Sequence, residues 1–307
     1  NFGPHIVMDT DDDLFIVLPM NPAFKDLGWQ ANGKPVPKNY TVECLDGNGN
    51  IMLLHQDGKN GFSVERNLAH LQAFRQNLRD ASLVTCSTQR VVDYVSREAG
   101  DSRPLTHIFP NCIDFADYPN VELADKGDKV RILWAGSGSH LEDLYQIQRQ
   151  LLNVHQKYPH VEFWMFGADY SWLLRQMDPD RTRHIGWCDY PLFKHNLSIM
   201  NHDIAIAPLH DCTFNWSRSA IKVYESAACC KPAATLCQRV GASADEVVEG
   251  ETGLLFDTPD QFEQQLCRLI EDTTLRKQIA ANAKDWVRTH RDPAKHVPLL
   301  IEAFQKL

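Results

Sequence analysis

The stretch FNWSRSAIKVYESAACCKP, residues 214–232, is the most specific part of this 307-residue sequence. Apolar residues recur at helical spacing in it, which predicts a helix over 219–230 with Ser219 as its N-cap. Lys222 and Glu225 lie three residues apart and therefore share one helix face. Because a helix start offers free N–H groups and a positive dipole end, this face suits a phosphate. An exposed salt bridge on an amphipathic helix is the alternative interpretation.

Strand-like and helix-like segments alternate on both sides of this stretch. The predicted strands are VRILWAG (130–136), VEFWMFG (161–167), RHIGW (183–187), DIAIAPL (203–209), AATL (233–236) and GLLF (253–256). Helices are predicted over 141–158 and 258–272, the second with Thr258 as its cap and Pro259 in its first turn. Alternation of this length implies an α/β fold, with a parallel sheet covered on both faces.

The N-terminal part of the sequence is less regular. The predicted elements are strands HIVM (5–8), SLVTCS (82–87) and LTHIF (105–109), helices over 64–80 and 88–100, and a hairpin over 41–55 with DGNGN as its turn. Three parallel strands are few for a complete doubly wound domain. The N-terminal domain is therefore expected to be short at its front.

Composition and charge narrow the class of protein. The net charge is -9 and no long Lys/Arg run occurs, which argues against nucleic acid as the main partner. The nine cysteines are an odd number without a C-x-x-C pair, which indicates reduced thiols and a cytoplasmic location. No apolar run reaches about 18 residues, so no spanning helix is expected. A peripheral membrane contact and the oligomeric state stay open.

A second glycine-containing turn follows the first strand of the C-terminal half. The segment WAGSGSHLEDL (134–144) places Gly136 and Gly138 between a strand and a helix. Small residues there let the backbone approach a phosphate. Leu141 fills the last glycine position of G-x-G-x-x-G, so the dinucleotide fingerprint is incomplete. A tight turn without a ligand is the alternative.

Three segments together resemble the C-terminal half of glycosyltransferase family 4. They are DIAIAPL (203–209), SRSAIKVYESAACCKPAAT (217–235) and DEVVEGETGLLFDTPDQFEQQLCRLIEDTTLRKQIAANAKDWV (245–287). The resemblance also covers ASLVTCSTQRVVDYV (81–95) and IFPNCID (108–114). It implies the GT-B fold, in which two Rossmann-like parallel-sheet domains face a cleft, with the front part of the N-terminal domain lacking here.

The resemblance also implies a division of the chain and a set of site residues. The expected division is an N-terminal acceptor-side domain (1–114), a linker (115–129), a nucleotide-sugar-binding domain (130–290) and a helix packing back toward the N-terminal domain (291–307). The site residues carried over are Gly136, Ser137 and Lys222 for the donor diphosphate, Glu225 for the ribose, and Gly186 and Trp187 beside the nucleobase. Trp187 is expected either to stack on the base or to be a core residue.

Two positions depart from the family's pattern. The first glutamate of the family's E-x7-E motif would fall at 217, where this sequence has Ser217. Contacts to the donor sugar are therefore expected from Asn215, Ser217 or nearby backbone. The usual basic residue after the 130–136 strand is also missing. Arg218 is expected to supply the second positive charge, and Arg218 and Ser219 are expected to hold the diphosphate together with Lys222.

The acidic run DTDDD, residues 9–13, follows the first strand. An Asp-x-Asp pair can hold a divalent metal, and a polar turn is the plain alternative. The resemblance implies a metal-independent enzyme, in which helix N-termini and basic side chains offset the leaving diphosphate. Asp9 or Asp11 is then expected to be catalytic, or to bind acceptor hydroxyls. Residues 46–50 resemble the start of a calcium loop, but Ile51 replaces its glycine, so no metal site is expected.

The function implied is that of a retaining glycosyltransferase without a cofactor. It would move a sugar from a nucleotide-diphosphate donor to a hydroxyl of a saccharide or lipid-linked acceptor. A nucleotide-sugar epimerase of the same fold is one alternative, and a non-catalytic nucleotide-sugar or carbohydrate-binding protein from a truncated gene is another. The sequence leaves the sugar, the base and the acceptor open.

Overall fold

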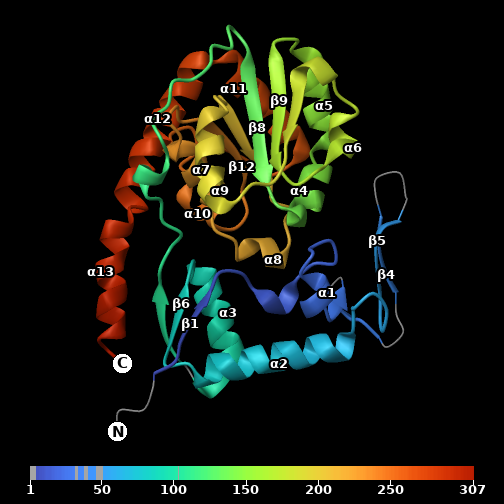
Figure 1. Cartoon of the computed structure of the whole chain (residues 1–307), viewed down its shortest axis with the longest axis vertical. Helices are drawn as coiled ribbons and strands as arrows, with labels where there is room; N and C mark the ends of the chain where they lie inside the picture. The colour runs from blue at the N-terminus through green and yellow to red at the C-terminus, as the bar shows by residue number, and fades with distance from the viewer. Residues whose placement is uncertain (1–4, 32–33, 38–40, 46–50, 103) are drawn as a thin grey trace. The chain divides into compact units, whose positions relative to one another are not determined.

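The chain divides into two compact units in the computed structural model (Figure 1), which describes residues 5–31, 34–37, 41–45, 51–102 and 104–307. Unit 1 comprises Asn1–Pro110, Cys212–Ser219 and Val297–Leu307. Unit 2 comprises Asn111–Asp211 and Ala220–His296. The last helix, α13 (Pro293–Phe304), therefore begins in unit 2 and ends in unit 1.

Unit 1 contains a parallel sheet of three strands in the order β1-β6-β7. These strands are β1 (Val7–Thr10), β6 (Leu83–Cys86) and β7 (Leu105–Ile108). Helices α2 (Val64–Asp80) and α3 (Gln89–Ala99) begin at the side-chain caps Ser63 and Thr88, and their apolar residues share a core cluster with Val84 of β6. The prediction of three parallel strands is confirmed.

The rest of unit 1 consists of short elements. They are η1 (Leu14–Ile16), α1 (Phe24–Leu27), β2 (Gln30–Ala31), β3 (Lys34–Pro35), β4 (Thr41–Leu45), β5 (Ile51–Gln56), η2 (Gly100–Ser102) and α8 (Thr213–Trp216). Strands β4 and β5 pair antiparallel, as the hairpin prediction requires. Residues 46–50, and with them the calcium alternative, lie outside the described residues.

Unit 2 is built on one parallel sheet of six strands in the order β10-β9-β8-β11-β12-β13. The strands are β8 (Val130–Gly136), β9 (Val161–Gly167), β10 (Thr182–Ile185), β11 (Ile204–Ala207), β12 (Ala234–Gln238) and β13 (Leu254–Phe256). Each overlaps one of the predicted strand segments. Apart from the edge strand β10, the β-branched and apolar runs form strands that are buried on both faces, as is typical of a parallel sheet.

Alternate side chains of β8 enter two separate apolar cores. Ile132 and Trp134 pack with α5 (Gln148–Lys157), α6 (Ser171–Leu174) and α11 (Pro259–Glu271). Leu133 points the other way. It packs with α7 (Tyr190–Ile199), α9 (Ile221–Ala228), α10 (Ala242–Glu246) and α12 (Thr273–His290). Helices therefore cover both faces, and the predicted α/β class is confirmed.

Two helix predictions need correction. Residues 141–158 form α4 (Leu141–Tyr145) and α5 instead of one helix. The break lets Ile147 enter the core, where it is fully buried, and lets Gln146 bond Gln238 at 2.7 Å. Helix α9 begins at Ile221, and Ala220 holds the cap position without a side-chain hydrogen bond, so Ser219 is not its N-cap.

No helix among the described residues has the length and apolarity that crossing a membrane requires.

Candidate functional site

The order of the six strands points to one edge of the sheet in unit 2. Numbered as they occur in the chain, the strands run 3-2-1-4-5-6, so the connections leave β8 and β11 in opposite directions. In open α/β sheets, ligands bind beside the carboxyl ends of the strands at this reversal. The predicted residues Gly136 and Ser137 lie at the carboxyl end of β8.

Lys222 reaches the same place from helix α9. Its Nζ donates a hydrogen bond of 2.5 Å to the carbonyl of Ala135 and lies 5.7 Å from the centre of the Trp134 ring. Residues that the sequence places 86 positions apart, Gly136 and Lys222, are thus brought together. A Cβ added to Gly136 would lie 2.9 Å from this Nζ. The structure therefore joins one cationic side chain to the glycine turn.

Gly136 has no room for a side chain. Its added Cβ would lie 2.7 Å from Cζ2 of the fully buried Trp134 and 3.1 Å from Cδ2 of His140. Gly136→Ala is therefore expected to lower the free energy of unfolding by about 1–3 kcal/mol through overpacking, a shift of several degrees in Tm by calorimetry. Gly186→Ala is the matched control, because no atom lies within 4 Å of its added Cβ. Equal Tm values for the two variants would contradict the expectation.

The turn that follows Gly136 is held by hydrogen bonds. Ser137 caps the 3-10 turn η4 (Gly138–His140), and its Oγ lies 2.7 Å from Oγ of Ser139. The hydroxyl of Tyr170 donates a hydrogen bond of 3.1 Å to the carbonyl of Ser137. These hydrogen bonds fix the shape of the turn.

Two buried side chains tie this turn to the loop after β11. Asp143 lies 2.6 Å from Nδ1 of His140 and accepts a hydrogen bond from the N–H of His210. Gln238 accepts a hydrogen bond of 3.1 Å from the N–H of Leu209. Neither His140 nor Asp143 is among the predicted site residues. Their i,i+3 spacing directly after the glycine turn is the signal that was available.

Glu225 lies one turn beyond Lys222 on α9. Its side chain is half-buried, and burial raises the pKa of the carboxyl group to about 7, although Lys222 and Lys194 oppose the shift. Lys194 itself forms an ion pair with Asp117. The positive charges around Glu225 are thus too weak to offset its loss of hydration. Hydrogen bonds donated by a ligand to the carboxylate would stabilise its ionised form and lower its pKa.

Gly186 and Trp187 lie in the loop after β10, at the same edge of the sheet as the glycine turn. The Trp187 side chain is 65% exposed. The alternative that Trp187 is a core residue is therefore wrong. Its neighbour Tyr190, at the start of α7, is 67% exposed. Nζ of Lys194 lies 4.8 Å from the centre of the Tyr190 ring, so the exposed indole of Trp187 is the better candidate for stacking on a planar group.

The other predicted donor residues belong to unit 1. Ser217 is 4% exposed, and its hydroxyl accepts a hydrogen bond of 3.1 Å from the N–H of Asp13 and donates one of 2.8 Å to the carbonyl of Phe214. Asn215 is equally buried. Nε of Arg218 lies 3.7 Å from Asp12, and both Arg218 and Ser219 belong to unit 1. The hydroxyl of Ser217 is thus used inside the unit.

The acids of the run at 9–13 have different surroundings. Asp13 is buried, and it accepts hydrogen bonds from Arg97 at 3.0 Å and from the N–H of Phe15. Burial raises the pKa of both Asp12 and Asp13 above the usual range, although arginines oppose the shift. Asp9 and Asp11 are exposed, and Thr85 donates a hydrogen bond to Asp9. Asp9 and Asp11 are therefore the exposed acids of the run.

Among the described residues, no group of three or more His, Cys, Asp or Glu side chains is placed to hold a metal ion.

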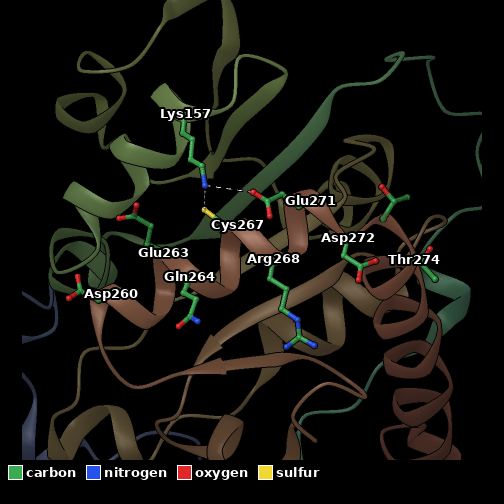
Figure 2. A pocket seen from close by; sticks show the side chains of 10 residues that line it. Lys157, Asp260, Glu263, Gln264, Cys267, Arg268, Glu271, Asp272 and Thr274 are labelled. Atoms are coloured by element: carbon green, nitrogen blue, oxygen red, sulfur yellow. Dashed lines mark hydrogen bonds and ion pairs between the residues drawn. The ribbon is translucent and has the colours of Figure 1, made fainter.

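A polar groove lies elsewhere in unit 2, along α11 and the ends of α5 and α12 (Figure 2). Lys157 lies 3.6 Å from Glu271 and 3.8 Å from Sγ of Cys267 across it. The side chains of Lys157 and Glu271 are 57% and 60% exposed. Ions this exposed interact weakly, because water screens them. The groove is therefore solvated surface, separate from the reversal of the sheet.

Comparison with known proteins places this architecture in a known fold. Sucrose-phosphate synthase from Thermosynechococcus elongatus superposes with a TM-score of 0.58 at 14% identity, over 79% of this chain and 62% of that one. HepE from Anabaena, in complex with UDP and glucose, superposes with a TM-score of 0.57 at 17% identity, over 76% of this chain and 67% of that one. The fold is GT-B.

The sequence match to a protein family covers less of the chain than the structural superpositions do. Residues 129–272 match the family described as glycosyl transferases, group 1. That range holds the glycine turn, Lys222 and Glu225. No curated protein matches the sequence. The chain spans about 62% of the length of the synthase.

Proposed function

We propose that this protein is a glycosyltransferase that takes its sugar from a nucleoside-diphosphate donor. The observation that carries the proposal is the position of Lys222 against the end of β8, where the sheet reverses. A cation there can offset the charge of a departing diphosphate. The group 1 match over the same residues supports this assignment, as does UDP with glucose in the HepE complex.

The predicted residues have these roles in the proposed reaction, with Arg218 and Ser219 kept as further candidates for the diphosphate. Lys222, Gly136 and Ser137 would hold the diphosphate, and Glu225 would accept hydrogen bonds from the ribose hydroxyls. Gly186 and Trp187 would flank the base, with stacking on the exposed indole. We retain Asp9 and Asp11 as candidates for the acceptor side, because both carboxylates are exposed. Ser217 and Asn215 are weaker candidates for sugar contacts, because both are buried.

The proposed reaction retains the anomeric configuration and needs neither a metal nor a cofactor, as the resemblance to family 4 implies. The acceptor would be a hydroxyl of a saccharide or of a lipid-linked saccharide.

A thermal-shift screen with UDP, GDP, ADP, TDP and CDP tests the proposal first, because a bound ligand raises the apparent stability. The matching nucleotide sugars are then incubated with and without saccharide acceptors. A sugar transferred to an acceptor supports the proposal. Product formed without an acceptor would indicate an epimerase. Binding without any turnover would indicate a non-catalytic nucleotide-sugar-binding protein.

Activity is expected to survive an excess of EDTA. In the proposed mechanism Lys222 offsets the leaving diphosphate, so removal of divalent ions should change the initial rate by less than about twofold, a negligible free energy. The measurement is the initial rate of transfer after dialysis against EDTA. A complete loss that Mn²⁺ restores would show that the acids at 9–13 act through a metal.

A further inference from the structure

The buried carboxylate of Asp143 fixes two loops at the reversal of the sheet in unit 2. Its Oδ2 atom lies 2.6 Å from Nδ1 of His140, in the turn after β8. Its Oδ1 atom accepts a hydrogen bond of 2.5 Å from the N–H of His210, in the loop after β11. Asp143 is 2% exposed. It is therefore placed to act through these loops rather than on a ligand.

The ring of His140 flanks the same point as Lys222. A Cβ added to Gly136 would lie 2.9 Å from Nζ of Lys222 and 3.1 Å from Cδ2 of His140. Cδ2 is bonded to Nε2, so the edge of the ring opposite Asp143 turns toward Gly136. The ring also packs edge-on against Trp134, with centroids 6.1 Å apart. One carboxylate and one indole thus orient the imidazole beside the lysine.

His140 lies near the position where a basic residue is expected after β8. The basic residue that the resemblance implies after β8 is missing, and Arg218 was its expected substitute. Nε of Arg218 lies 3.7 Å from Asp12 of unit 1, and the role of Arg218 at the diphosphate stays a prediction. An ionised carboxylate on Nδ1 stabilises positive charge on an imidazole and leaves Nε2 as the donor at the other edge. In the protonated imidazole, Nε2 carries a proton that it can donate on the Lys222 side of the ring.

We propose that His140, oriented by Asp143, binds the diphosphate of the donor together with Lys222. The inference rests on the proposed function and names a further ligand-binding residue for it. Asp143 is then a positioning residue, since it contacts the imidazole and a backbone N–H. The ligand chemistry is a pyrophosphate group, whether in a nucleoside diphosphate or in a nucleotide sugar.

Calorimetric titration of the full chain tests this role. The ligands are UDP and UMP, or the diphosphate and monophosphate of the nucleoside that the screen selects. His140→Gln is expected to weaken UDP binding about tenfold, the effect of losing one charged hydrogen bond, and to change UMP binding less than twofold. Asp143→Asn leaves the imidazole of His140 neutral but keeps its proton on Nε2. The UDP affinity of this variant should therefore lie between those of wild type and Asp143→Ala. His160→Gln, at an exposed histidine, is the control.

Three results would overturn the proposal. One is an equal loss of UDP and UMP affinity in His140→Gln, which indicates a purely structural role. Another is unchanged UDP affinity. If the variants fail to fold, histidine-selective ¹⁵N NMR of the wild type replaces them. Addition of UDP should then shift the His140 Nε2 signal, and an unshifted signal excludes the contact.

Titration with inorganic pyrophosphate separates this inference from the proposed function. If no nucleotide binds, but pyrophosphate binds to wild type and about tenfold more weakly to His140→Gln, the site stands and the nucleotide assignment fails. If neither pyrophosphate nor any nucleoside diphosphate binds, the site itself is refuted.

Discussion

Lys222→Ala is expected to lower the rate of sugar transfer by about 100-fold to 1000-fold, the usual cost of removing one preorganised group that stabilises transition-state charge. A hydrogen bond holds Nζ of Lys222 at the carbonyl of Ala135. Little reorganisation is then needed when negative charge develops on the leaving diphosphate. The effect should appear in kcat as well as in KM, because charge on the diphosphate is greatest in the transition state.

Steady-state rates with the selected nucleotide sugar measure this effect. Lys277→Ala, at an exposed lysine of α12 in the same unit, is the control and should retain the wild-type rate. Lys222→Arg tests the geometry of the site. Arginine keeps the positive charge, but its guanidinium group is broader than the ammonium group of lysine. A Lys222→Ala variant with the wild-type kcat would refute the role of this residue in the proposed reaction.

Glu225→Gln is expected to remove a pH dependence from nucleotide binding and to weaken binding at pH 8. The pKa of Glu225 is raised to about 7 in the free protein, chiefly by burial. Ribose hydroxyls that donate to the carboxylate would lower this pKa in the complex, so binding would release a proton. Relative to the Gln variant, wild-type affinity should therefore fall as the pH drops below about 7, by up to tenfold per pH unit.

Titration calorimetry at pH 5.5, 6.5 and 8 measures both effects, and the titration of the ligand's own phosphate cancels between wild type and variant. Glu251→Gln, at an exposed glutamate in the same unit, should keep the wild-type profile. Identical profiles for wild type and Glu225→Gln would show that the carboxylate does not contact the nucleotide. Glu225→Ala should weaken binding about 10-fold to 100-fold, as the loss of hydrogen bonds to a charged group predicts.

The same shift predicts how the unliganded protein responds to pH. A carboxyl group whose pKa is raised from 4.5 to about 7 on folding contributes stability that is fully present below pH 4.5 and is lost as the pH rises through 7. The free energy of unfolding of Glu225→Gln, relative to wild type, should therefore increase between pH 5 and pH 8. Denaturant titrations at the two pH values measure this difference, and a constant difference would contradict the shift.

The architecture of unit 2 was predictable because its signals are local. Each β-branched or apolar run that ends in a glycine or a polar turn forms a strand, and residues 258–271 form α11 with the predicted cap at Thr258. Caps and hydrophobic periodicity depend on neighbours within a few residues. Helix boundaries that depend on packing were not predictable. The break between α4 and α5 follows from burying Ile147, which requires the whole core.

The sequence by itself determined the α/β class, the three strands of unit 1, and the pairing of Lys222 with Glu225 on one helix face. Only the tertiary structure decided which distant groups meet. It placed Lys222 at the end of β8, engaged Ser217 and Arg218 with Asp13 and Asp12 in unit 1, and set His140 and Asp143 beside Gly136. The physical reason is that hydrophobic periodicity is a property of neighbouring residues, whereas a binding site depends on contacts made when separate elements pack together.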